Sequence, residues 1–144
     1  MLSNTCKYAI RAVLYLALKT EEGNKIGIKQ ISKDLDIPTP FLGKIMQSLA
    51  KHKLLSSTKG PHGGFGLGKN PKDILLMDIV EIIDGMDSFH KCIIGVKYCS
   101  EQEHPCAVHS RYAQLREEVR KVFESETIER IVEDVKKGKQ SFFI

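Results

Sequence analysis

Three cysteines and one histidine lie close together in the sequence with the spacing C-x6-C-x6-C-x2-H: Cys92, Cys99, Cys106 and His109. Three of the four cysteines of the chain are therefore gathered in one stretch of mostly polar residues. Thiolates and imidazoles that converge on one point can hold an iron–sulfur cluster, which needs about four such ligands. Zinc accepts the same ligand set but prefers paired C-x2-C motifs, which this stretch lacks. The spacing therefore favours an iron–sulfur site over zinc, with bare thiols that form a disulfide as a second alternative.

A long helix is expected to present the last two of these ligands. Pro105 is typical of the first turn of a helix, and the pattern that follows continues to about Glu124. Cys106 and His109 would then be three residues apart on one helical face. The positive end of the helix dipole would favour the thiolate form of Cys106.

The loop before this helix, roughly residues 86–105, would bring in Cys92 and Cys99. His90 and His104 lie in the same region and could compete as ligands. A loop histidine is usually solvated, so neither is included in the predicted ligand set.

The same helix carries a stripe of apolar residues with spacings of 4, 3, 4 and 3, formed by Val108, Tyr112, Leu115, Val119 and Val122. This period is typical of a coiled-coil seam. The seam could pack on its own domain or pair with a second copy. Because the helix follows a small head, we favour a homodimer. A last helix is expected over residues 127–136.

The N-terminal part of the chain predicts three helices, over residues 3–20, residues 28–35 and a segment that starts at Thr39-Pro40. Thr39 would cap this third helix and Pro40 would occupy its first position, where no hydrogen bond is lost. Its inward stripe is Leu42, Ile45, Met46 and Leu49, and its outward residues are Gly43, Lys44, Gln47, Ser48 and Lys51. Two short helices joined by a tight turn, the second with a small, polar and basic outer face, indicate a helix-turn-helix.

A glycine-rich hairpin is expected after the helix-turn-helix. Residues 54–58 form one strand and residues 65–67 the return strand. The tip between them reads Lys59-Gly60-Pro61-His62-Gly63-Gly64, which suits positive φ angles and a close approach of the backbone to another surface. A wing of this kind can place cations beside phosphates or in a minor groove.

Charge is distributed unevenly along the chain. Residues 1–72 carry twelve Lys/Arg against four Asp/Glu, whereas residues 73–144 carry ten against fourteen. A basic N-terminal half favours double-stranded DNA as a partner. No apolar run is long enough to span a membrane and residues 1–19 do not resemble a signal peptide, so a cytoplasmic protein is expected.

Enzyme activity is not expected, because no G-x-S-x-G, P-loop or paired-carboxylate pattern is present. An iron–sulfur electron carrier is the main rival class. It would not need the outward polar face of the third helix or the glycine-rich wing.

With these motifs together, the chain resembles the IscR-type family of bacterial winged-helix transcription regulators (the Rrf-two family). The resemblance covers essentially the whole length and is carried by four motifs: Tyr8-Ala9-Ile10-Arg11, Ile28-x-x-Ile31-Ser32-x-x-Leu35, Phe41-Leu42-x-Lys44-Ile45-Met46-x-x-Leu49, and Lys59-Gly60-Pro61-x-Gly63-Gly64-Phe65-x-Leu67. The spaced cysteines match as well.

The resemblance implies a mainly α fold with a small β-hairpin wing, in which a winged helix-turn-helix is followed by a long dimerisation helix. The expected domains are a DNA-binding head (1–72), a connecting helix (73–85), a cysteine loop (86–105) and the dimerisation and C-terminal helices (106–144). The residues expected to contact DNA are Thr39, Pro40, Gly43, Lys44, Gln47, Lys51, Lys59, Gly60, His62, Gly63 and Gly64.

The function implied is a homodimeric regulator, expected to be a repressor, that binds near-palindromic operators and senses redox, nitric oxide or iron–sulfur status. A 2Fe–2S cluster with His109 as the fourth ligand is favoured. A 4Fe–4S cluster, with a ligand from the first helix of the partner, is the alternative; there the sequence offers Cys6, more often a small buried hydrophobe, and Lys7, which cannot ligate a metal. A regulator of the same fold that senses through thiols or a partner protein is the other functional alternative.

Three departures from the best-known member prevent transfer of its operator sequence. The cysteines here are separated by one residue more. A base-reading position falls on Gly43, which has no side chain. The minor-groove arginine is replaced by Lys59, a point charge rather than a planar fork.

Overall fold

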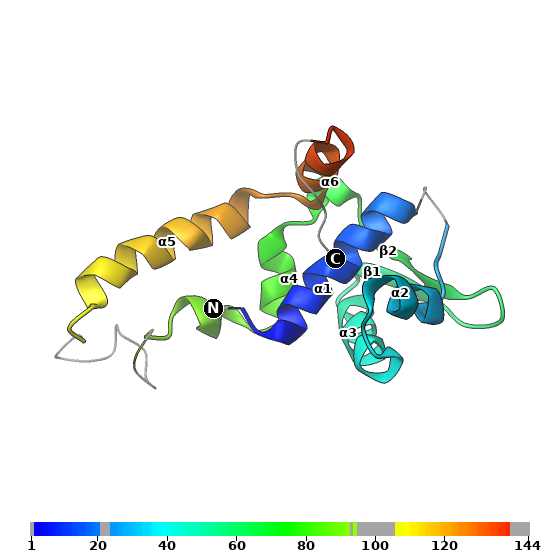
Figure 1. Cartoon of the computed structure of the whole chain (residues 1–144), viewed down its shortest axis with the longest axis horizontal. Helices are drawn as coiled ribbons and strands as arrows, with labels where there is room; N and C mark the ends of the chain where they lie inside the picture. The colour runs from blue at the N-terminus through cyan, green and yellow to red at the C-terminus, as the bar shows by residue number, and fades with distance from the viewer. Residues whose placement is uncertain (1, 21–23, 93, 95–105, 139–144) are drawn as a thin grey trace.

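The computed structural model describes residues 2–20, 24–92, 94 and 106–138 (Figure 1). In chain order the elements are α1 (Asn4–Lys19), α2 (Ile28–Leu35), α3 (Thr39–Lys51), β1 (Leu55–Thr58), β2 (Gly64–Leu67), the 3-10 turn η1 (Pro71–Asp73), α4 (Leu76–Ile83), the 3-10 turn η2 (Met86–Phe89), α5 (His109–Ser125) and α6 (Ile128–Lys136). The prediction of a mainly helical chain with a small β-hairpin is confirmed. Among the helices in the described ranges, none is long and apolar enough to cross a membrane.

Helix α1 is the centre of the head, and α2, α3, α4 and α6 pack around it. It begins where predicted, because the Ser3 hydroxyl accepts a hydrogen bond from the Cys6 amide at 3.0 Å. Its apolar residues recur at helical spacing and are almost fully buried, among them Ala9, Ala12, Val13 and Leu16. The main core is completed by buried residues of the surrounding elements, including Ile31, Leu35, Leu42, Met46, Leu49, Leu54, Ile74, Ile79 and Ile128.

The turn between α2 and α3 is held by side-chain hydroxyls. Asp36 adopts a left-handed conformation with φ of 53°, and the chain then turns into α3. Thr39 was expected to cap α3, but the cap position belongs to Pro38, and Thr39 is the first helical residue. The Thr39 hydroxyl instead donates to the Ser32 hydroxyl at 2.8 Å, and Ser32 donates to the Ile37 carbonyl at 2.6 Å. This chain of bonds sets the angle between the two helices.

The wing is a two-stranded antiparallel hairpin with Leu55 opposite Leu67 and Thr58 opposite Gly64. A third segment pairs with it, because Ile26 and Phe65 exchange two backbone hydrogen bonds of 2.9 and 2.8 Å. Gly64 lies directly under this segment, and a β-carbon there would be only 2.4 Å from the Ile26 carbonyl oxygen. The glycine is therefore required for a close approach inside the protein.

Gly64→Ala is expected to lower the free energy of unfolding by about 2 kcal/mol, because the rigid Ile26 backbone cannot make room for a methyl group. Chemical denaturation followed by circular dichroism measures the difference. Gly43→Ala is the matched control: its new β-carbon would meet only Ile28 Cδ1 at 3.5 Å, and alanine favours a helix by up to about 1 kcal/mol. Equal stability of Gly64→Ala and the unmodified protein would contradict the close contact.

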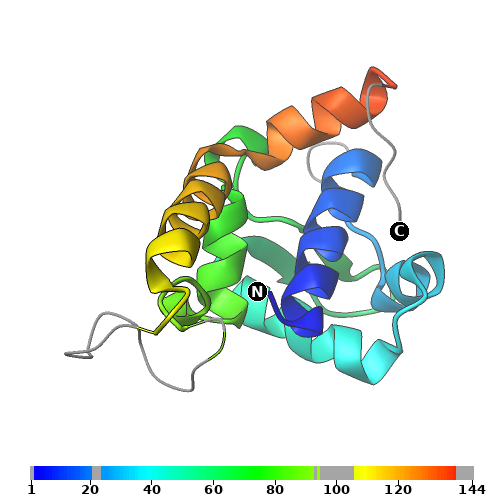
Figure 2. The same cartoon turned by 60° about the vertical axis from the view of Figure 1, so that its left-hand side comes forward.

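Helix α5 projects from the head and packs beside α4 and η2 (Figures 1 and 2). The C-terminal end of α5 is attached to the head by two backbone hydrogen bonds. The Leu76 amide donates to the Glu126 carbonyl at 3.0 Å, and the Ile128 amide donates to the Ile74 carbonyl at 2.9 Å. Helix α6 then returns across α1, as the expected last helix, and is capped by the Thr127 hydroxyl.

The start of α5 differs from the prediction. The helix begins at His109, not at Pro105, and Cys106 lies before it in a turn. The Cys106 carbonyl accepts the His109 amide at 2.9 Å, whereas no side chain caps the helix. Proline at the first turn is only a preference, and here the residues from Cys106 to Val108 form a turn of their own. Cys106 and His109 are thus neighbours across a turn rather than along a helical face.

Candidate nucleic-acid interface and cysteine site

The outer face of α3 is exposed at most of the positions predicted to contact DNA. Lys44, Gln47, Lys51 and Pro40 are exposed, and Thr39 is half-buried. Gly43 is also half-buried, because its α-carbon lies beside Ile28 of α2. Together these residues form a surface with small and basic groups on the second helix of the helix-turn-helix.

The tip of the wing is exposed at Lys59, Gly60 and His62. Gly60 has φ of 105°, a conformation that other residues rarely adopt, so the predicted need for glycine is confirmed there. Gly63 is half-buried and Gly64 is buried, and a β-carbon at Gly63 would collide with the Thr58 carbonyl. The side chains that the wing offers to a ligand are therefore Lys59 and His62.

Two of the predicted metal ligands lie in contact. Cys92 Sγ and Cys106 Sγ are 3.3 Å apart, although the residues are 14 positions apart in the sequence. Two thiolates bound to one tetrahedral metal at ordinary bond lengths would be about 3.8 Å apart, and two sulfurs in a disulfide about 2.05 Å apart. Either state can be reached from the observed separation by a small movement, so the sulfur pair fits both a thiolate-bound metal and a disulfide.

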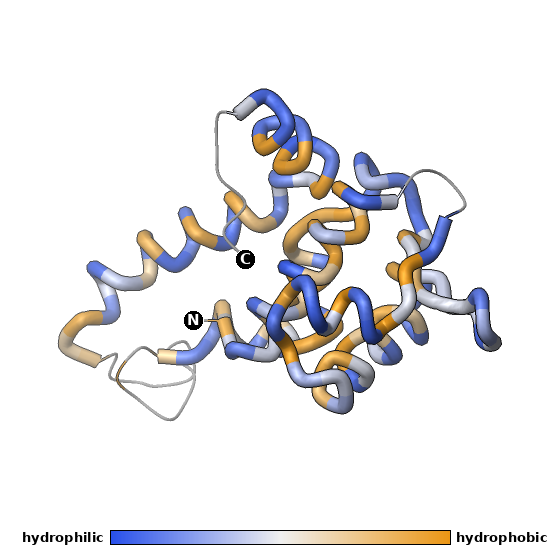
Figure 3. Tube along the Cα trace, turned by 45° about the vertical axis from the view of Figure 1, so that its right-hand side comes forward, coloured by the Kyte–Doolittle hydropathy of each residue, from blue (hydrophilic) through white to orange (hydrophobic). Residues whose placement is uncertain are grey.

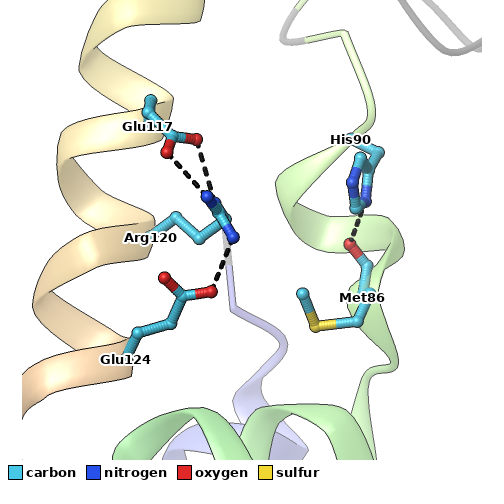
Figure 4. Close-up of polar contacts among 5 residues, drawn as sticks. All are labelled: Met86, His90, Glu117, Arg120 and Glu124. Atoms are coloured by element: carbon cyan, nitrogen blue, oxygen red, sulfur yellow. Dashed lines mark hydrogen bonds and ion pairs between the residues drawn. The ribbon is translucent and has the colours of Figure 1, made fainter.

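Two of the histidines in this part of the chain differ in their contacts. The Nδ1 atom of His109 is buried and has no hydrogen-bond partner in the described part of the chain. Buried polar atoms usually have a partner, so this nitrogen is a candidate metal ligand. His90 is engaged, since its Nδ1 lies 2.8 Å from the Met86 carbonyl oxygen (Figure 4). His104 and Cys99 lie outside the described residues.

The predicted four-ligand site is therefore described in part. Within the described ranges no three metal-binding side chains converge on one point. The structure brings Cys92 and Cys106 together, but it does not bring His109 to them, although the His109 nitrogen is buried and unpartnered in the described part of the chain. The complete set with Cys99 stays a prediction.

The remaining cysteine, Cys6, lies in a separate apolar cluster with Met77, Val80 and Phe89. It is fully buried. Burial, and then the nearby negative charge of Asp84, raise the pKa of the Cys6 thiol to about 12. A thiol of this kind is a poor metal ligand, because ligation needs the thiolate.

Alkylation should distinguish the cysteines. The rise of the Cys6 pKa from 9.0 to about 12 lowers its thiolate fraction about a thousandfold at neutral pH. We expect iodoacetamide to modify Cys106 in the native protein while Cys6 stays unmodified, as read by peptide mass spectrometry. In denaturant the two should react alike. Modification of native Cys6 at the rate of Cys106 would contradict its burial.

The seam of α5 is largely uncovered. Leu115, Val119 and Val122 are 58%, 49% and 53% exposed. Figure 3 shows apolar residues recurring along this helix. A mostly apolar groove of about 330 Å³ runs along it, lined by Leu2, Lys7, Phe89, Tyr112, Leu115, Arg116, Val119 and Phe123. Of these, Leu2, Phe89 and Phe123 were missed from the sequence, because nothing in it indicates that the N-terminus and η2 meet α5.

Arg120 of α5 is paired with two glutamates of the same helix. Arg120 donates to Glu117 at 2.7 and 2.9 Å and to Glu124 at 2.6 Å (Figure 4). The Arg120 guanidinium also holds the pKa of Glu117 below its usual value. These ion pairs lie within α5, and the exposed apolar seam of the same helix is the surface that suits a partner.

A helix-turn-helix followed by a two-stranded wing defines a winged-helix DNA-binding protein. The model of the Rrf2 family, described as an iron-dependent transcriptional regulator, matches residues 2–134. The chain belongs to this family and is a transcription regulator; members of the family bind DNA, and its relatives are named as regulators, not enzymes. The expected resemblance is confirmed.

Individual relatives agree. An HTH-type transcriptional regulator of Aquifex aeolicus is 35% identical over 131 residues, or 90% of each chain. The regulator IscR of Photorhabdus laumondii is 28% identical over 131 residues, covering 91% of this chain and 78% of its own. Two solved structures share the fold with a TM-score of 0.74. CymR, the global cysteine regulator of B. subtilis, is 23% identical over 92% of this chain and 96% of its own. IscR of T. potens is 21% identical over 99% and 93%.

Proposed function

We propose that this protein is a homodimeric transcription regulator whose choice of operator responds to an iron–sulfur cluster. The cluster would be held by Cys92, Cys99, Cys106 and His109, with 2Fe–2S favoured and 4Fe–4S as the alternative. The observation that carries the sensing part is the contact of Cys92 with Cys106 at 3.3 Å, beside the start of α5. Relatives named IscR belong to the same family, described as iron-dependent.

Operator DNA would be read by α3 and the wing. Lys44, Gln47 and Lys51 are exposed on one face of α3, and Lys59 and His62 are exposed at the wing tip. We propose that α3 enters the major groove while the wing reaches the adjacent minor groove, with phosphate contacts from the lysines. We further propose that binding represses transcription, and that the protein acts in the cytoplasm, where bacterial DNA is found.

A second copy of the chain would cover the seam of α5. The uncovered apolar residues Leu115, Val119 and Val122 have the spacing of a coiled-coil seam, and Arg120 is already paired with two glutamates of the same helix. A pair of heads joined in this way would bind two half-sites, with about 34 Å between the reading helices.

The sensing site and the reading head are joined by a short route. Cys92 follows η2, which follows α4. At the end of α4, Asp84 accepts the Ser3 amide at 2.8 Å and also the Ser3 hydroxyl, at the cap of α1. We propose that ligand binding at Cys92 and Cys106 fixes η2 against the start of α5, and that Asp84 passes this constraint to α1 and so to the spacing of the heads. When bound, an iron–sulfur cluster supplies reversible electron transfer.

A thiol sensor is the second candidate, and the same sulfur contact favours it. Cys92 and Cys106 would lose two protons and two electrons to an oxidant such as hydrogen peroxide, which becomes two molecules of water. The disulfide would hold η2 to the start of α5, as metal ligation would.

Salt dependence tests the DNA-binding part and excludes an electron carrier. Each phosphate that the protein neutralises contributes about −0.9 to the slope of log affinity against log salt. Because a homodimer loses one phosphate contact in each protomer, Lys44→Ala and Lys59→Ala are each expected to reduce that slope by about two in fluorescence anisotropy with a duplex operator. Lys136→Ala, on the exposed surface of α6, is the control and should change nothing. Unchanged slopes in both test variants would contradict the assigned face.

A further inference from the structure

Arg116 joins α5 to the segment that carries Cys92. Its Nη1 donates to the carbonyl oxygen of His90 at 3.3 Å and to that of Lys91 at 3.4 Å. The guanidinium also lies 5.8 Å from the centre of the Tyr112 ring, one turn earlier in the helix. The two carbonyls belong to the two residues directly before Cys92. This contact therefore acts on the piece of backbone that presents the Cys92 sulfur.

The other described polar contacts of His90 and Lys91 are with residues of the same segment. The His90 amide donates to the Asp87 carbonyl at 3.0 Å, the Lys91 amide donates to the same oxygen at 2.9 Å, and Lys91 Nζ lies 3.6 Å from an Asp87 carboxylate oxygen. These bonds stiffen η2, but they do not set its position relative to α5. Phe89 packs against Phe123 with ring centres 5.8 Å apart, and this apolar contact has little directional preference. Arg116, by contrast, lies on α5, the helix that begins at His109, and bonds to the segment before Cys92.

We propose that Arg116 is a positioning residue that keeps the Cys92 sulfur beside the Cys106 sulfur. A planar guanidinium donates to two neighbouring carbonyls here while it lies near an aromatic ring, and a lysine, with a compact ammonium on a different stem, is not its equivalent. Since Cys92 arrives at the end of η2 and Cys106 at the start of α5, their 3.3 Å contact depends on how η2 lies against α5. The inference rests on the proposed function in one respect, because this pair would be the centre of the cluster site. The pairing itself can be measured without a cluster.

The test uses the full-length protein without iron, with Cys99→Ser so that Cys92 and Cys106 are the reactive pair. Oxidised glutathione takes two electrons and two protons from the two thiols and becomes two molecules of reduced glutathione. The equilibrium constant of this exchange, read from the disulfide-linked peptide by mass spectrometry, reports how closely the sulfurs are held. Arg116→Gln is compared with Arg111→Gln, which removes the same charge from an exposed position of the same helix.

Arg116→Gln is expected to lower the constant about fivefold, the effect of losing one net hydrogen bond. The equilibrium constant of Arg116→Lys should regain less than half of that loss. The constant of Arg111→Gln should equal that of the protein with both arginines. Circular dichroism and sedimentation, run on each variant, should show the same helix content and oligomeric state. If Arg116→Gln alters either, the comparison of Arg116→Lys with Arg111→Gln carries the test.

Cobalt(II) gives a second measure on the protein with all its cysteines, since thiolate ligation produces a charge-transfer absorption. Its affinity should fall in Arg116→Gln and not in Arg111→Gln. The proposal would be overturned if Arg116→Gln had the same disulfide-exchange constant as the protein with Arg116. It would also be overturned if Arg111→Gln lowered that constant as much as Arg116→Gln does. A pair that forms no disulfide in any variant would also overturn it. If the protein took up no cluster, the proposed function would fail while the order of these constants stayed as stated.

Discussion

Leu115→Glu combined with Val119→Glu is expected to convert the proposed homodimer into monomers and to lower operator affinity at least ~100-fold. Both residues lie in the uncovered seam of α5, and burying carboxylates at an apolar helix–helix contact costs free energy through desolvation. Separating the heads removes the gain from binding two linked half-sites, which is on the order of a hundredfold or more. Sedimentation velocity and an electrophoretic mobility shift measure the two effects.

The matched control is Ser110→Glu with Gln114→Glu. These residues are exposed on the polar side of the same helix and have the same spacing, so the control adds the same charge outside the seam. It should stay dimeric and keep its affinity within about twofold, once the small salt-dependent repulsion from DNA is allowed for. A double-glutamate seam variant that remains dimeric would show that α5 is covered by something other than a second copy.

Cys92→Ala is expected to abolish cluster uptake after anaerobic reconstitution, with iron content and visible absorption falling to background. The reason is that Cys92 supplies one of the two sulfurs in contact, and alanine has no metal-binding group. Cys6→Ala is the control: Cys6 is buried in its own apolar cluster, and its loss should leave the spectrum unchanged. Full iron content and an unaltered spectrum in Cys92→Ala would remove the sulfur pair from the site.

Cluster loss in Cys92→Ala should also change DNA binding without removing it. The residues proposed to read DNA lie on α3 and the wing, whereas Cys92 follows η2, after the head. The free energy of non-specific, salt-dependent binding should therefore stay the same, while discrimination between operators changes.

The head was predictable because each of its elements has a local signal. Ser3 caps α1 and Thr127 caps α6, as their residue types indicate. The helical spacing of apolar residues predicts α3, and the glycine-rich tip predicts the wing, each to within a residue or two of its observed position. These signals depend on residues that are close in the sequence, so tertiary contacts do not change them.

The errors lie where tertiary contacts decide. Thr39 has the residue type of a helix cap, yet its hydroxyl bonds to Ser32 of α2, a partner set by the angle between two helices. Gly64 was expected to approach an outside surface, but it makes room for Ile26. Arg116 is one of several charged residues on a charged helix, and nothing in the sequence indicates that it contacts the backbone before Cys92.

The cysteine site was predicted largely from residue spacing. The structure supports one part of that prediction and contradicts another. The long sequence separation of Cys92 and Cys106 did not prevent their contact, because η2 and α5 pack side by side. The shared helical face of Cys106 and His109 was wrong, since α5 begins at His109. A turn before the helix still leaves the His109 nitrogen buried and unpartnered in the described part of the chain.

Selection of operators by the same protein with and without its cluster tests the central claim most directly. A pool of random duplexes is enriched anaerobically, once with reconstituted protein and once with the iron-free form, and affinities for the two winning sequences are then measured with both forms. We expect each form to prefer its own sequence, by about tenfold or more, a coupling free energy of about 1.4 kcal/mol. Identical winning sequences with equal affinities in both forms would contradict a cluster that controls DNA recognition.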